Sequence, residues 1–236
     1  MATSESAPFF EHTWSVYDLI SEQNYMFHRE LYAKVAQLLK QRKDCNKYRL
    51  LDLGCGNARF LAPSLVLSPP AQYQGVDLSG NALREAQTYL AELSCPVELT
   101  HRDLLETLET SVRRWDVIFT GFALHHLSRD QKARLFGAAG QCLSDNGWLL
   151  MVDVVREENQ SREEYLQEYL RDMRGRWTGI PPEQLELACE HVAANDYPEQ
   201  LPALQEMAKA SGLNNSCVIG KFGHHHAVLF SRGVAP

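Results

Sequence analysis

The segment 50–60 joins an apolar stretch to a turn that contains two glycines, Gly54 and Gly56. Glycines here let the backbone turn tightly and approach a ligand with no Cβ in the way. Asp77 ends the next apolar stretch, 23 residues beyond Gly54, roughly where an acid on a second strand reaches ribose hydroxyls. A dinucleotide site would have a third glycine at position 59, where this chain has Arg59. The pattern predicts a site for a nucleoside-containing cofactor and disfavours a dinucleotide.

Two groups of histidines could handle a proton or a metal ion. His125 and His126 follow a predicted strand and would lie at the carboxyl edge of the sheet, where open α/β folds bind ligands. Either ring could take a proton from a hydroxyl or an amine, or could cap a helix or pack under the sheet. Strand alternation places His224 and His226 on one face and His225 on the other. These residues could contact substrate, bind a metal or form a solvated hairpin end; because no third ligand is evident, we predict no metal site.

Three motifs resemble those of a known enzyme class. Leu51-Asp52-Leu53-Gly54-Cys55-Gly56 and Gly75-Val76-Asp77-Leu78-Ser79 resemble the first two motifs of class I S-adenosylmethionine-dependent methyltransferases, in order and spacing. His125-His126-Leu127 resembles a motif of many small-molecule methyltransferases. The segment lacks the Asp/Asn-Pro-Pro-Tyr/Phe tetrapeptide of enzymes that methylate exocyclic amines of nucleic-acid bases or amide nitrogens. The resemblance covers about residues 47–232 and implies S-adenosyl-L-methionine as cofactor.

The resemblance also implies roles for individual residues. The glycine turn would cradle the methionine end of the cofactor, with Asp52 near its ammonium group and Asp77 accepting both ribose hydroxyls. Leu78 would pack on the adenine and Asp103 would accept its amino group, although Asp103 could instead cap a helix. The predicted cofactor-binding residues are Asp52, Gly54, Cys55, Gly56, Asn57, Asp77, Leu78, Asp103, Leu104, Thr120 and Phe122. The predicted catalytic residues are His126 and His125.

The acceptor site is less well defined by the sequence. The aromatic N-terminal segment either packs in the core or forms a lid over cofactor and acceptor. Arg156 could hold an anionic acceptor through a bidentate contact, but an exposed ion-paired helix also explains the arginines and acids that follow it. The predicted substrate-binding residues are Tyr17, Tyr25, His28, Arg156, His224 and His226.

Short apolar stretches alternate with amphipathic ones along most of the chain. This alternation predicts an α/β, doubly wound, mostly parallel sheet. The expected strands are 48–53, 72–77, 96–101, 115–120, 147–153, 215–220 and 224–231, with helices from about 57 to 67 and over 198–212. The resemblance implies a seven-stranded, Rossmann-like methyltransferase fold with an antiparallel last strand beside the fifth and a small helical cap.

We expect one domain with four parts. They are an N-terminal helical lid segment over residues 1–46, a cofactor-binding core over 47–155, a helical cap insertion over 156–197, and a C-terminal helix and β-hairpin over 198–236 that complete the sheet.

Composition limits the classes of partner. The net charge of −7 over 236 residues gives no basic field for nucleic acid. The six cysteines form no Cys-x-x-Cys pair and read as reduced thiols, and no stretch approaches the 18 apolar residues of a membrane span. We therefore expect a soluble, cytoplasmic monomer or homodimer that acts on a small molecule and binds neither nucleic acid nor membrane.

The combined prediction is methyl transfer from S-adenosylmethionine to an oxygen, or next a nitrogen, of a small-molecule acceptor, leaving S-adenosylhomocysteine. Metal-assisted catechol methylation is disfavoured, because it needs several acids around a divalent ion and only Asp153 is evidently at the right edge. Two alternatives stay open. The same cofactor could be remodelled or could donate an aminopropyl group, or the chain could be a non-catalytic partner subunit with this fold.

Overall fold

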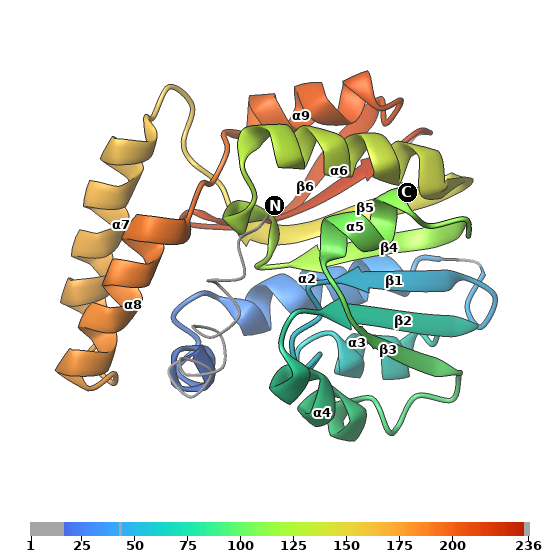
Figure 1. Cartoon of the computed structure of the whole chain (residues 1–236), viewed down its shortest axis with the longest axis horizontal. Helices are drawn as coiled ribbons and strands as arrows, with labels where there is room; N and C mark the ends of the chain where they lie inside the picture. The colour runs from blue at the N-terminus through green and yellow to red at the C-terminus, as the bar shows by residue number, and fades with distance from the viewer. Residues whose placement is uncertain (1–16, 43, 234–236) are drawn as a thin grey trace.

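The computed structural model describes residues 17–42 and 44–233, so the first 16 residues of the predicted lid lie outside the described part. A seven-stranded sheet of order β3-β2-β1-β4-β5-β7-β6 forms its centre (Figure 1). The strands are β1 Arg49–Leu53, β2 Gln72–Asp77, β3 Val97–His101, β4 Trp115–Gly121, β5 Leu143–Val154, β6 Asn215–Phe222 and β7 His225–Ser231.

Strands β1 to β5 are parallel, and β7 runs antiparallel between β5 and β6. The antiparallel last strand therefore lies beside the fifth, and the predicted Rossmann-like methyltransferase fold is confirmed. Strand order reverses between β1 and β4, and ligands of open α/β sheets bind in the crevice at the carboxyl ends flanking such a point.

Helices cover both faces of the sheet. They are α2 His28–Leu39, α3 Ala62–Leu67, α4 Gly80–Tyr89, α5 Leu104–Glu109, the 3-10 turn η1 Leu124–His126, α6 Arg129–Cys142, α7 Arg162–Arg176, α8 Pro182–Asn195 and α9 Leu201–Ala210. Figure 1 shows α2, α3 and α4 on one face and α5, α6 and α9 on the other. Side chains alternate between the two faces of each strand, so β1 contributes to both helix layers. Leu51 and Leu53 belong to the core under α5 and α6, whereas Leu50 belongs to the core under α2 and α3.

The pair α7 and α8 forms the cap, beyond the carboxyl ends of the parallel strands (Figure 1). A capping box between Ser161 and Glu164 starts α7. Tyr165, Tyr169 and Met173 follow at intervals of four, so they share one helix face, which is buried. This face packs with Ile20 of the helix over residues 17–22, and the cap thereby covers the ligand edge of the sheet.

Two predicted boundaries are wrong for local reasons. The helix expected from about residue 57 begins at Ala62, because Gly54, Gly56 and Ala58 all have positive φ and the chain cannot enter a helix before this turn ends. The fifth strand begins at Leu143 instead of Gly147, since Leu143 already pairs with Trp115, before an irregularity in which β5 has the extra residues.

All six cysteines are free thiols. Among residues 17–42 and 44–233, no helix combines the length and the apolar character needed to cross a bilayer.

Candidate active site

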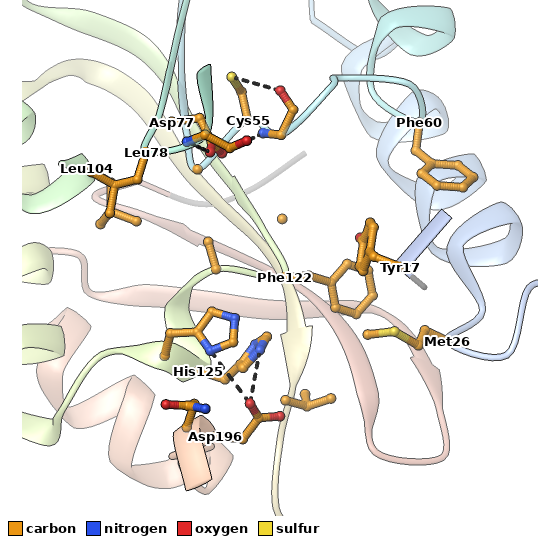
Figure 2. A pocket seen from close by; sticks show the side chains of 18 of the residues that line it. Tyr17, Met26, Cys55, Phe60, Asp77, Leu78, Leu104, Phe122, His125 and Asp196 are labelled. Carbon is orange, nitrogen blue, oxygen red and sulfur yellow. Dashed lines mark hydrogen bonds and ion pairs between the residues drawn. The ribbon is translucent and has the colours of Figure 1, made fainter. Parts of the chain in front are cut away.

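A cavity of about 490 Å³ opens at the carboxyl ends of β1, β2 and β4, beneath the cap. Asp77 and Leu78 lie at one end of it, His125 and Asp196 lie at the other, and Phe122 lies between them (Figure 2). One continuous space therefore connects the glycine turn after β1 with the histidines after β4.

Backbone geometry makes the glycine turn. Gly54 has φ 69° and Gly56 has φ 52°, in the left-handed region that favours glycine. A Cβ on Gly54 would lie 2.6 Å from the Cβ of Ala123, so this position also lets the turn approach the loop after β4. The amides of Gly54 and Cys55 both donate to the carbonyl of Val76, at 2.9 and 3.0 Å. The turn is thus tied to β2, directly before Asp77.

Asp77 is held by the backbone around it. Its Oδ2 accepts a hydrogen bond from the Gly56 amide and its Oδ1 accepts one from the Ser79 amide, both at 2.8 Å. Burial raises the pKa of Asp77, although these two amides oppose the shift. Since each oxygen has two lone pairs, both can still accept a hydroxyl from the cavity.

Asp52 is buried beside the same turn. Tyr73 donates a hydrogen bond from its hydroxyl to Asp52 Oδ2 at 2.7 Å, whereas Oδ1 has no donor among the described residues. Burial raises the pKa of Asp52 to about 7. A buried carboxylate oxygen without a donor is costly and suits a cationic ligand, such as an ammonium group.

Aromatic side chains form the wall between the two ends. Phe122 has φ 53°, which is strained for a residue with a side chain, and its amide donates to Val152 at 2.7 Å. Behind it, the His28 ring lies 4.6 Å from the Phe122 ring and 4.4 Å from the Phe60 ring, between centroids. Tyr17 reaches His28 Nε2 with its hydroxyl at 3.1 Å. The helix over residues 17–22 is thereby attached to the cavity wall.

The other end of the cavity is built on Asp153, near the end of β5. Its Oδ1 lies 2.5 Å from His125 Nδ1, and its Oδ2 accepts the amides of Leu124 and His125 at 2.8 and 3.2 Å. Burial lowers the pKa of His125, but the carboxylates of Asp153 and Asp196 outweigh it and raise the pKa to about 9. Burial and the neighbouring His125 keep the pKa of His126 well below its usual range. These two adjacent rings therefore differ in protonation at neutral pH.

Asp196, directly after α8, completes this end of the cavity. Its Oδ1 lies 3.7 Å from His125 Nε2 and 3.6 Å from His126 Nδ1. Burial raises the pKa of Asp196 to about 6, although His125 opposes the shift. Figure 2 shows both imidazole contacts converging on this carboxylate.

The cap supplies the apolar part of the lining. Tyr169 and Met173 from α7 face the cavity, with Ala188 and Val192 from α8. Trp177 joins them and stacks on Tyr25, with ring centroids 5.3 Å apart and planes 7° apart. Because these residues come from a part of the chain without motifs, the sequence did not indicate them.

Most of the predicted site residues line this cavity. They are Tyr17, Asp52, Gly54, Cys55, Gly56, Asn57, Asp77, Leu78, Asp103, Leu104, Phe122, His125 and His126. Asp103 also accepts the Glu106 amide at 2.9 Å, so it caps α5, the alternative role left open by the sequence.

Three predicted residues lie behind the lining. Thr120 shares a face of β4 with Ile118, whereas Phe119 and Gly121 face the cavity. Tyr25 lies behind Trp177, and its hydroxyl accepts the Gly179 amide at 2.8 Å. His28 is covered by the aromatic wall, and burial lowers its pKa to about 3.

Three others lie away from the cavity. Arg156 donates from Nε to the Pro198 carbonyl at 2.7 Å and thus joins two connections of the cap. His226 is buried on the face of β7 that also carries Val228, and its Nδ1 lies 3.0 Å from the His224 carbonyl. His224 packs edge-on against Tyr165, with ring centroids 5.1 Å apart. The remaining histidine, His225, supports the lining instead: its Nε2 lies 2.9 Å from the Tyr169 hydroxyl.

Arg59 and His191 line the cavity although the sequence assigned them no role. Arg59 lies over the Phe60 ring, 4.9 Å from its centroid, and Nη1 lies 3.6 Å from Asp18. Arg59 occupies the position at which a dinucleotide motif would have glycine, and this was the only feature of the sequence that drew attention to the residue.

Comparison with known proteins agrees with this architecture. Residues 51–149 match the family model of a methyltransferase domain. The structure is similar to the YcgJ protein from Bacillus subtilis, with 19% identity, a TM-score of 0.58, and coverage of 80% of this chain and 71% of that one. A search of curated proteins found no match.

Two further solved structures are similar in fold. An O-methyltransferase family protein from Burkholderia thailandensis has 15% identity and a TM-score of 0.61, and the match covers 89% of this chain and 59% of that one. Magnesium protoporphyrin IX methyltransferase from Synechocystis PCC 6803, solved with bound S-adenosylhomocysteine, has 13% identity and a TM-score of 0.60, with coverage of 87% and 83%. At these identities the similarity establishes a shared fold.

The fold, the glycine turn and the match of residues 51–149 to a methyltransferase domain all agree with the predicted class, an enzyme with S-adenosylmethionine as cofactor.

Proposed function

We propose that this enzyme methylates an oxygen, or next a nitrogen, of a small and largely apolar acceptor that binds beneath the cap. The observation that carries the proposal is the single cavity with the glycine turn and Asp77 at one end and a buried His125–His126–Asp196 group at the other. Methyl transfer needs the two reactants aligned and water excluded, and a space beneath the cap with a polar group at each end favours both.

At the cofactor end, we assign three roles. The two oxygens of Asp77 would accept the ribose hydroxyls, Asp52 Oδ1 would face the ammonium group, and the glycine turn would allow the backbone to approach. When bound, S-adenosylmethionine supplies a methyl carbon on a positively charged sulfur. The Phe122 ring would then separate that carbon from bulk water on the side of β4.

At the acceptor end, the His126 ring, which is neutral, would face the reacting heteroatom and accept its proton, whereas His125 beside it already carries one. Asp153 orients the His125 ring through the 2.5 Å contact at Nδ1 and so directs Nε2 toward the cavity. Tyr169, Met173 and Trp177 line the adjoining space, which favours an aromatic or aliphatic hydroxyl compound over a highly charged one. No basic surface in this lining favours nucleic acid.

A calorimetric titration with S-adenosylhomocysteine is the direct test, followed by an acceptor screen with product analysis. Release of S-adenosylhomocysteine in an acceptor-dependent reaction supports methylation. Methylthioadenosine or an altered cofactor as the product would instead indicate aminopropyl transfer or remodelling. Absence of binding in folded protein would indicate the partner-subunit alternative.

Binding of S-adenosylhomocysteine is expected to depend on pH through Asp52. The pKa of this group is about 7 in the empty site, and an ammonium ligand requires the carboxylate. Affinity should therefore fall about tenfold between pH 7.5 and pH 6, as the group must release a proton to bind. Calorimetry across this range checks it, and Asp52→Asn should bind more weakly and lose the pH dependence. If Asp52→Asn kept the same change of affinity with pH as the parent, Asp52 would not be the group that faces the ammonium.

The same residue predicts an effect of opposite sign on stability. Folding raises the pKa of Asp52 from 3.8 to about 7, so its contribution to stability is fully present below about pH 4 and is lost as pH rises through 7. Asp52→Asn keeps an acceptor for Tyr73 but carries no charge. Its gain in melting temperature over the parent should be larger at pH 8 than at pH 5, by scanning calorimetry, and an equal difference at both pH values would refute this.

A further inference from the structure

Three atoms that commonly bind metals converge at the acceptor end of the cavity. They are Nε2 of His125, Nδ1 of His126 and Oδ1 of Asp196, and all lie within 4.8 Å of one another. The carboxylate oxygen is 3.7 Å from the first nitrogen and 3.6 Å from the second. These separations are too long for hydrogen bonds. They are close to the edges of a tetrahedral zinc site, which are about 3.3 Å for ligand bonds of about 2.0 Å.

The carboxylate of this group lacks a local hydrogen-bond donor. Asp196 is only 4% exposed, and its Oδ1 has no donor in the part of the chain that the structure describes. Removing a carboxylate oxygen from water without a partner is costly unless a cation compensates for it. A metal ion between Asp196 and the two rings would supply this charge in place of the proton on His125 Nε2.

The contacts of Asp153 prepare His125 for such a role. Asp153 accepts three backbone amides, from Leu124, His125 and Val154, and is therefore held as a carboxylate acceptor. The proton that Asp153 faces lies on His125 Nδ1, so a metal ion that displaces the other ring proton would find the lone pair on Nε2, toward Asp196. A carboxylate behind a ligating histidine is the usual arrangement that orients the ring in protein metal sites.

We propose that His125, His126 and Asp196 form a binding site for a divalent first-row transition-metal ion, with zinc as the best fit. Two imidazoles and one carboxylate suit zinc or iron, whereas magnesium and calcium need ligand sets of oxygen atoms. Three protein ligands also leave a coordination position open on the side of the cavity, as in catalytic rather than structural sites. This site differs from the His224–His226 pair that the sequence brought to attention.

The open position faces the space assigned to the acceptor. An acceptor hydroxyl bound there would ionise more readily, since a metal ion acts as a Lewis acid. That role rests on the proposed function, whereas binding of the ion rests only on the three side chains. The two are therefore tested separately.

The test is a titration of full-length, tag-free protein, first dialysed against chelator, with ZnCl2 by calorimetry and with CoCl2 by visible absorption. We expect one tightly bound ion per chain and a cobalt spectrum with nitrogen and oxygen ligands. Asp196→Asn and His126→Ala should weaken binding by at least about 100-fold, and Asp153→Asn by about 10- to 100-fold, the range for loss of a supporting residue. His226→Ala is the matched control, because it removes a histidine outside the cavity, and it should bind zinc as the parent does.

Zinc binding that survives Asp196→Asn and His126→Ala, or that is lost in His226→Ala, would overturn the proposal. So would the absence of binding in folded parent protein. Each sample is also titrated with S-adenosylhomocysteine. Retained cofactor binding without zinc binding would reject the metal site and leave the proposed methylation intact, whereas zinc binding without cofactor binding would reject the methylation alone.

Discussion

Asp77→Asn is expected to weaken S-adenosylhomocysteine binding by about 10- to 150-fold, corresponding to the 1.5–3 kcal/mol of a lost hydrogen bond to a charged group. Both carboxylate oxygens of Asp77 accept backbone amides at 2.8 Å, from Gly56 and Ser79. An asparagine can accept only one of them and would direct its NH2 group toward the other. The substitution therefore removes the charge and disturbs the turn that approaches the cofactor. Calorimetric titration measures the effect.

Glu98→Gln is the matched control for this variant. Glu98 is an exposed carboxylate on the neighbouring strand β3, paired with Arg113 at 3.1 Å and outside the cavity. The affinity of Glu98→Gln for S-adenosylhomocysteine should stay within about twofold of the parent's, since exposed ion pairs contribute little to stability. A circular dichroism melt shows whether each variant is folded. Unchanged affinity in folded Asp77→Asn would remove Asp77 from the binding site.

His126→Ala is expected to lower turnover by about 100-fold or more while the affinity for S-adenosylhomocysteine stays within about twofold. The ring lies 3.6 Å from Asp196, which is at the end of the cavity opposite Asp77 (Figure 2), so we do not assign it to the cofactor cradle. Its loss removes a group that faces the acceptor, whether the ring receives the proton itself or helps to hold a metal ion. The measurement is the rate of S-adenosylhomocysteine release with the acceptor found by screening.

His226→Ala serves here too as the comparison. This residue is buried on β7 outside the cavity, with Nδ1 3.0 Å from the His224 carbonyl, so turnover should change less than twofold in protein that remains folded. Equal losses of turnover in both variants would mean that histidine removal acts through the fold. Normal turnover in His126→Ala would exclude this residue from the reaction.

The cofactor end could be read from the sequence because its geometry is local. Gly54 and Gly56 follow β1 and Asp77 ends β2. Because these two strands pair in parallel and only α3 lies between them, their carboxyl ends meet at one edge of the sheet. Alternation of apolar and amphipathic stretches predicted the seven strands, whereas the antiparallel position of β7 was implied by the family resemblance. The direction of single side chains was harder to predict, since strand alternation points Thr120 away from the cavity. The start of α3 was also misplaced, because positive φ angles at Gly54, Gly56 and Ala58 keep the chain out of a helix until Ala62.

The acceptor end depends on contacts between distant segments. Asp196 and His125 are joined by no motif, and their 3.7 Å approach exists only because α8 packs on α7 and returns the chain to η1. The Tyr197 amide, which donates to the His125 carbonyl at 2.7 Å, holds this return in place. For the same reason the sequence favoured His224 and His226, which are conspicuous as a run, over Asp196, which is not.

By itself, the sequence predicted the fold and the turn that we assign to the cofactor, because strand periodicity and the glycine turn act over short stretches of chain. Only the tertiary structure decided which side chains face the acceptor, because that wall is made by helices packed from far along the chain. The fate of the six substrate residues illustrates the difference: Tyr17 lines the cavity, and Tyr25, His28, Arg156, His224 and His226 do not. Their positions were set by packing against neighbours that no local pattern specifies.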